Sequence, residues 1–122
     1  MLKQILTVGI SVTDPDQAID FYINKLGFEK RIDVSMGEGM RWIEVAPPGA
    51  QTALVLAKGY GPDQDRIGKF TGYVFGTDDI EATYETLKSR GVRFTKPPSV
   101  EPWGKWAQFV DQDGNEFGLK AD

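Results

Sequence analysis

Apolar and polar residues alternate along several short stretches of the chain, the pattern of strands that are buried on one face only. Residues 6–13, LTVGISVT, place valine and isoleucine on one side and Thr7 and Ser11 on the other. Similar stretches predict further strands over residues 28–34, 40–46, 52–57, 70–77, 92–95, 103–110 and 116–120. Pro97 and Pro98 predict a loop between two of these strands, because proline cannot donate to a sheet ladder.

Two stretches have a helical period instead. Apolar residues recur at helical spacing in residues 14–28, DPDQAIDFYINKLGF, and again in residues 78–92, DDIEATYETLKSRGV. Each stretch begins with aspartate, whose side chain accepts hydrogen bonds from the free amides of a first helical turn. Gly27 and Gly91 stand where a helix commonly ends in a positive φ. We therefore expect two amphipathic helices, each followed by a strand.

The two helical stretches belong to one unit that occurs twice. A shift of 64 residues carries the first stretch onto the second, and also carries Trp42 onto Trp106 and Glu44 onto Gln108. A repeat of about half the chain indicates two copies of one supersecondary unit. Each copy is predicted to contain one strand, one helix and three further strands, which gives an α+β fold class.

The length of 122 residues predicts one domain over residues 1–122, with repeats at 1–58 and 70–122. Residues 59–69, GYGPDQDRIGK, are polar and aperiodic, and we expect them to form the loop between the repeats. A second interpretation of this segment is that it covers a site.

Composition removes several classes of function. The net charge is −4 and no run of lysine and arginine is present, so we expect no nucleic-acid partner. The chain has no cysteine and no histidine, which removes thiol nucleophiles, disulfides and the commonest metal ligand. No stretch has the length of a membrane span or the pattern of a signal peptide. We therefore expect a cytoplasmic protein without a membrane partner.

These motifs resemble those of the vicinal oxygen chelate superfamily, which includes glyoxalases, bleomycin-resistance proteins and ring-cleaving dioxygenases. The similar pieces are DPDQAIDFYINKLGF, its echo DDIEATYETLKSRGV, and DQDGNEFGL near the end of the chain. The resemblance covers nearly the whole sequence. It implies two βαβββ repeats that form curled mixed sheets around a shared cavity, and it implies a homodimer.

The resemblance also bears on metal binding. Enzymes of this superfamily usually hold a divalent metal by histidine and glutamate, and the resemblance places those ligands at Thr7, near Val55, at Gly72 and at Gly118. Threonine is a weak neutral ligand, and valine and glycine side chains offer no donor. We therefore expect no metal and no cofactor. The resemblance then points to binding proteins, such as those that sequester antibiotics.

The strand faces suggest what a ligand would contact. One face of the predicted strands is apolar and fits packing against the helices. The opposite face carries the candidate ligand-binding residues Thr7, Trp42, Glu44, Trp106, Gln108 and Glu116, with Trp103 at the mouth. An indole from each repeat would suit a flat aromatic or conjugated organic ligand. In the joining loop, Tyr60 and Arg66 are further candidates.

Other interpretations remain open at this stage. The paired tryptophans also fit a role as filler or as dimer contacts, and Glu44 and Glu116 fit ordinary surface charges. A metal-independent lyase, transferase or dioxygenase-type enzyme would use Glu44 or Glu116 as a general base. A metal-dependent enzyme of this kind is disfavoured by the ligand positions. A subunit or regulatory module with a vestigial cavity is a third possibility.

Overall fold

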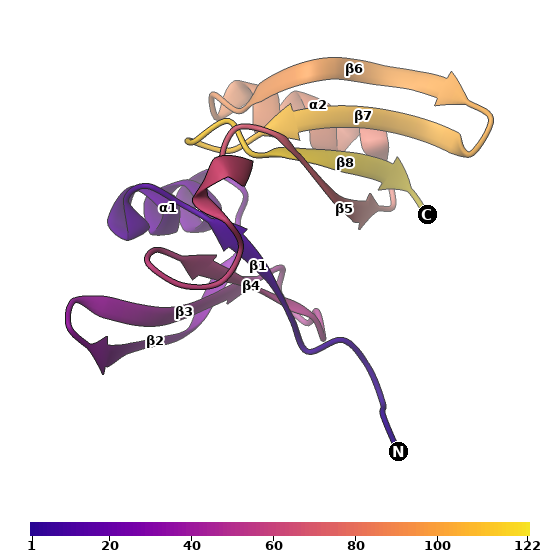
Figure 1. The fold of residues 1–122 in the computed structure, drawn as a ribbon. Coiled ribbons are helices and arrows are strands. Elements are labelled where there is room, and N and C mark those ends of the chain that lie inside the picture. Colours follow the sequence, from indigo (N-terminus) through magenta and orange to yellow (C-terminus); the bar gives the residue numbers. More distant parts are fainter. The chain divides into compact units, whose positions relative to one another are not determined.

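The computed structural model describes all residues, Met1–Asp122, and consists of two compact units, Met1–Ile67 and Gly68–Asp122 (Figure 1). Each unit contains one four-stranded mixed sheet and helical turns. The two units have the same order of elements, so the predicted β-α-β-β-β repeat and the α+β class are confirmed. Neither helix has the length and apolar character needed to cross a membrane.

The first unit has the sheet order β1-β4-β3-β2, with β1 parallel to β4 and the other neighbours antiparallel. Its strands and helix are β1 (Thr7–Ser11), α1 (Pro15–Asp20), β2 (Glu29–Gly37), β3 (Met40–Ala46) and β4 (Ala53–Ala57). A short 3₁₀ turn over Gln64–Arg66 follows in the joining segment.

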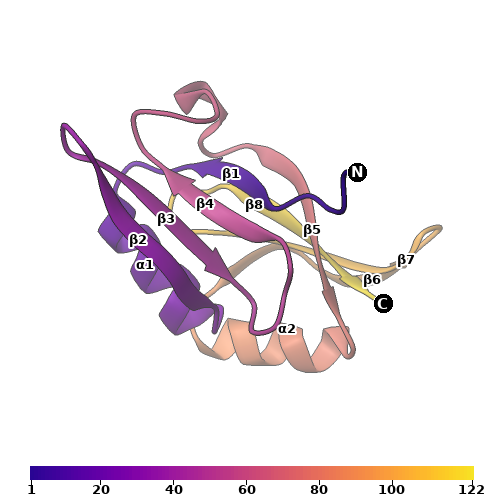
Figure 2. The same cartoon turned by 90° about the horizontal axis from the view of Figure 1, so that it is seen from below.

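The second unit repeats this arrangement with the order β5-β8-β7-β6. Its elements are β5 (Phe70–Thr77), α2 (Ile80–Ser89), β6 (Arg93–Glu101), β7 (Gly104–Val110) and β8 (Glu116–Ala121). Here α2 runs along one face of the strands β6, β7 and β8 (Figure 2). The Asp79 carboxylate accepts a hydrogen bond from the amide of Ala82 and caps this helix, as the sequence predicts.

The first helix departs from the expected regular α-helix. Asp14 caps α1 by accepting hydrogen bonds from the amides of Asp16 and Gln17, but residues 21–25 form a π-helical turn. A π turn adds residues to one turn of helix. Both Phe21 and Tyr22 are buried in this turn.

The prediction of a loop at Pro97 and Pro98 is wrong. Strand β6 continues through Pro97 and Pro98 to Glu101. Because β6 is an edge strand, its residues need ladder hydrogen bonds on one side only, and proline is tolerated there. The register shifts between Phe94 and Ser99 accommodate the missing donors.

The stretch between the predicted strands at residues 28–34 and 40–46 shrinks to a tight turn. Strand β2 extends to Gly37, and the chain reverses at Glu38 and Gly39, both of which have positive φ. Two successive residues with positive φ match the twist of a two-residue hairpin.

Each core lies between a sheet and its helix, on the face that the alternation predicts. In the first unit Ile43, Val45, Leu54 and Leu56 are at most 4% exposed. The corresponding positions of the second unit are Ala107, Phe109, Phe117 and Leu119, and Phe109 and Phe117 pack with ring centroids 5.6 Å apart. The opposite face of each sheet is called the open face below. It carries Trp42 and Glu44 in the first unit and Trp106 and Gln108 in the second.

Candidate functional site

On the open face of the first unit, strand β3 presents Trp42 and Glu44. The indole Nε1 of Trp42 donates a hydrogen bond to Oε2 of Glu44 at 2.8 Å. Glu44 lies opposite Ile32 on β2 and Val55 on β4 in the sheet register. The hydrogen bond fixes the indole along the strand and leaves its rings on the surface of the sheet.

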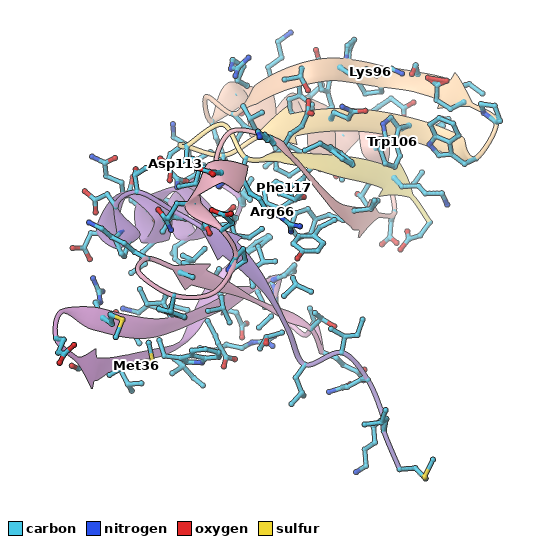
Figure 3. The ribbon with its side chains drawn as sticks, in the orientation of Figure 1. Met36, Arg66, Lys96, Trp106, Asp113 and Phe117 are labelled. Atoms are coloured by element: carbon cyan, nitrogen blue, oxygen red, sulfur yellow. The ribbon has the colours of Figure 1, made fainter.

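The open face of the second unit contains the same arrangement on β7. Nε1 of Trp106 donates to Oε1 of Gln108, also at 2.8 Å. Gln108 lies opposite Lys96 on β6 and Gly118 on β8. Lys96 and Trp106 are labelled on this sheet in Figure 3. The residues that the 64-residue shift pairs are therefore equivalent in structure: each tryptophan is held by a side-chain oxygen two residues along its own strand.

The two indoles differ in what lies against them. Trp42 is stacked with Tyr60, with ring centroids 5.9 Å apart and an interplanar angle of 20°. The Tyr60 hydroxyl donates to the backbone oxygen of Arg41 at 2.6 Å, and burial raises the pKa of this phenol. The joining segment thus brings a candidate ligand-contacting residue, Tyr60, onto the open face of the first unit.

The same segment is fastened at a second point. The Ser11 hydroxyl donates to the backbone oxygen of Pro62 at 2.5 Å. A Cβ added to Gly9 would lie 2.9 Å from Cδ of Pro62, so the proline ring rests directly on β1. Val55, which pairs with Gly9, is only 4% exposed although it points to the open face. Residues 59–62 therefore cover part of this face.

Trp106 is supported differently. A Cβ added to Gly118 would lie 2.3 Å from Cη2 of the indole, which means that the benzo ring fills the space above this glycine. Trp103 packs edge-on against Trp106, with centroids 5.7 Å apart at 88°, and is itself 53% exposed. Trp103 and Trp106 form an aromatic pair at one end of the second sheet.

Exposed apolar residues, which the sequence analysis did not assign to the site, accompany both indoles. On β2, Ile32, Val34 and Met36 alternate and are 39%, 52% and 42% exposed; Met36 is labelled in Figure 3. On β5, Phe70 and Val74 are 48% and 46% exposed, and they pair with open-face positions of β8. The alternation in residues 32–36 carried this signal. Fixed aromatic rings beside exposed apolar side chains favour contact with a flat apolar molecule.

The remaining candidates take more ordinary positions. The Glu116 carboxylate accepts a hydrogen bond from the Thr95 hydroxyl. Thr7 pairs with Ala53 at the start of β1 and is half-buried. Arg66 lies exposed at the end of the short 3₁₀ turn. Within the first unit, Tyr60 rather than Arg66 is the joining-segment residue that touches an expected ligand-binding side chain.

The residues at the four superfamily metal positions do not fit a divalent cation. Val55 and Gly118 carry no donor atom, and the indole of Trp106 fills the space in which a longer side chain at position 118 would lie. Gly72 lies in the irregular part of β5, where the register shifts between Phe70 and Val74. Thr7 alone offers an oxygen, and one neutral hydroxyl does not make a metal site.

Comparison with known proteins gives a consistent result. The model of the Glyoxalase/Bleomycin resistance protein/Dioxygenase superfamily matches residues 4–119. The uncharacterised protein YetH of Bacillus subtilis is 42% identical, over 98% of this chain and 99% of its own.

Two solved structures are also similar. A member of the same superfamily from Sphaerobacter thermophilus superposes with a TM-score of 0.89 at 41% identity, covering 99% of this chain and 98% of the other. TnmS3, an antibiotic binding protein from Streptomyces sp. CB03234, superposes with a TM-score of 0.86 at 36% identity, covering 98% and 96%.

Proposed function

Because the chain belongs to the Glyoxalase/Bleomycin resistance protein/Dioxygenase superfamily, we propose that it binds a small organic ligand with flat aromatic or conjugated rings, without a metal. One observation carries this proposal. The same hydrogen bond from an indole to a side-chain oxygen recurs on both open faces, at Trp42–Glu44 and at Trp106–Gln108. Metal-dependent chemistry of this superfamily would need donors that Thr7, Val55, Gly72 and Gly118 do not supply.

The two hydrogen bonds reduce the side-chain conformational entropy that is lost when a ligand binds. A free indole samples several rotamers, and ordering one side chain costs about 0.5–1.5 kcal/mol. Here Glu44 and Gln108 each hold one ring by a side-chain hydrogen bond within its own strand. A ligand that stacks on them therefore loses little of its interaction free energy to ordering. The fixed orientation of each ring therefore favours a role in ligand binding over a role as filler.

The apolar neighbours define the ligand further. Covering about 100 Å² of apolar surface contributes about 2.5 kcal/mol, and aromatic stacking adds about 0.5–1.5 kcal/mol. Ile32, Val34 and Met36 beside Trp42, and Phe70 and Val74 in the second sheet, extend the apolar area. A polycyclic antibiotic is one such ligand, in line with the description of TnmS3.

The test is a titration of purified protein with anthracycline and glycopeptide antibiotics, flavonoids and small thiol conjugates. Binding is read from quenching of tryptophan fluorescence, with EDTA, Mn²⁺ or Zn²⁺ in parallel runs. We expect saturable quenching by flat aromatic members that does not change with chelator. Quenching that requires added metal would overturn the proposal. Conversion of a compound to product would favour the enzyme alternative with Glu44 or Glu116 as base.

Variants assign the binding to the open faces. Loss of a stacking indole removes about 2–3 kcal/mol, so Trp106→Ala or Trp42→Ala should raise Kd about 30- to 150-fold. Glu85 is exposed on α2, on the far side of the second sheet, and Glu85→Ala is the matched control. Unchanged Kd in both tryptophan variants would remove the indoles from the site.

A further inference from the structure

We propose that Gly118 determines the class of ligand that the second open face binds. Because glycine has no side chain, the indole of Trp106 packs directly on the backbone of β8 at this position, which we call the seat of the indole. This inference rests on the proposed function and names the position on which it depends. Gly118 has an ordinary backbone conformation, so no positive φ accounts for a glycine at this position. It lies in the interior of β8, where glycine weakens a strand unless something approaches the backbone closely.

The indole of Trp106 is what approaches. A Cβ at position 118 would lie 2.3 Å from Cη2, 2.6 Å from Cζ2 and 3.0 Å from Cζ3 of this ring. Carbon atoms in van der Waals contact are about 3.5–4.0 Å apart. Any residue other than glycine would therefore push the benzo ring away from the sheet by about 1 Å or more.

The ring has little freedom to yield. Its Nε1 is bonded to Oε1 of Gln108 at 2.8 Å, and Gln108 pairs with Gly118 across the two strands. The edge-on packing of Trp103 lies against the same indole. Rotation of the ring to admit a Cβ would break the hydrogen bond or disturb this aromatic pair.

The first unit provides the comparison within the same chain. Val55 pairs with Glu44 in the register in which Gly118 pairs with Gln108. A Cβ is present there, and Trp42 stacks with Tyr60 from the joining segment. The seat is therefore a property of the second open face alone, and that face is the one suited to a ligand stacked on a rigid, sheet-backed indole.

The experiment is a double-mutant cycle of Gly118→Ala and Trp106→Ala in the full chain. We expect Gly118→Ala to lower Tm by about 5 °C or more, as overpacking does, and to shift the indole N–H resonance of Trp106 in a ¹H–¹⁵N spectrum. In the Trp106→Ala background the same change should cost little, because the obstructing ring is gone. Gly76→Ala is the control, since the three atoms nearest to its Cβ would all belong to the side chain of Asp122 and none to Trp106.

Binding is measured with daunorubicin, a planar tetracyclic antibiotic, by calorimetry. Gly118→Ala should raise its Kd at least 10-fold and Gly76→Ala should leave it unchanged within about 2-fold. If the Tm changes of the two substitutions are additive, or if the Trp106 resonance does not move, the inference that Trp106 packs on Gly118 is wrong. A clear coupling with unchanged Kd would overturn its role in ligand choice. If wild type binds neither daunorubicin nor any member of the wider panel, the proposed function fails, while the cycle still decides whether the seat exists.

Discussion

Replacing Glu44 separates its two candidate roles, as the oxygen that holds an indole and as a general base. Its Oε2 accepts the Trp42 Nε1–H bond at 2.8 Å, and Gln108 shows that an amide oxygen makes the equivalent bond at the same distance. Glu44→Gln should therefore keep Trp42 in place. Glu44→Leu removes the acceptor and frees the ring.

The magnitude follows from the bond. A hydrogen bond to a charged group contributes about 1.5–3 kcal/mol, and one to a neutral group about 1 kcal/mol. Water reaches the half-buried Trp42 and offsets part of this loss. We expect Glu44→Gln to weaken ligand binding by less than about 5-fold, and Glu44→Leu to weaken it by about 5- to 30-fold.

Calorimetry with the strongest binder of the panel measures both variants, and the Trp42 indole resonance reports whether the ring stays in place. If Glu44→Gln weakens binding as much as Glu44→Leu, the negative charge itself acts on the ligand, and the positioning role is refuted. If a turnover found for wild type survives in Glu44→Gln, the general-base alternative at this residue is eliminated.

Three further predictions concern the framework of the site. The Arg41 guanidinium bonds Asp33 at 2.8 and 3.1 Å and Asp16 at 2.9 Å, and the hydrogen bond from Arg41 lowers the pKa of Asp33. This stabilisation is complete at a pH above the ordinary aspartate pKa of about 3.9, and it is lost as the pH falls through the lower pKa that Asp33 has in the folded state. Arg41→Met should therefore lower the free energy of unfolding by about 1–3 kcal/mol at pH 7 and by clearly less at pH 2.5. Urea unfolding at the two pH values measures the difference. Tyr60→Phe should lower stability by about 1 kcal/mol through loss of the bond to the Arg41 backbone. It should keep the ring stacked on Trp42, so the indole resonance of Trp42 should stay close to its wild-type position, and a large shift of this resonance would contradict the reasoning. The homodimer expected from the superfamily predicts twice the 13.5 kDa chain mass by sedimentation at micromolar concentration, and a monomer mass would exclude it.

The sequence predicted the elements whose signals are local. Alternation placed most of the strands, and the aspartate caps placed both helix starts. The continuation of β6 through Pro97 and Pro98 could not be read in this way, because it depends on β6 being an edge strand, which is a property of the assembled sheet. The π turn at residues 21–25 was not predicted either, because the spacing of apolar residues there is that of a regular helix.

For the site, the repeat carried more information than any motif. The 64-residue shift paired Trp42 with Trp106 and Glu44 with Gln108. In the structure each tryptophan donates a hydrogen bond of 2.8 Å to the side chain two residues further along its strand. The shared cavity that the resemblance implies stays a prediction. The support behind each indole was not predictable, because Tyr60 comes from an aperiodic segment and the seat at Gly118 is defined by a ring on the neighbouring strand.

Trp42 stacks with Tyr60, whereas Trp106 packs on the backbone of β8, and the difference follows from the residues Val55 and Gly118. A Cβ at position 118 is incompatible with the ring of Trp106, and Val55 carries a Cβ at the matching register. Trp42 therefore cannot rest on β4 as Trp106 rests on β8, and the ring of Tyr60 stacks on it instead. A ligand that uses the first indole must share it with Tyr60 or displace that ring, whereas the second indole is already backed by the sheet. The Kd of Tyr60→Ala distinguishes these outcomes: tighter binding means displacement, and weaker binding means that Tyr60 is part of the contact surface.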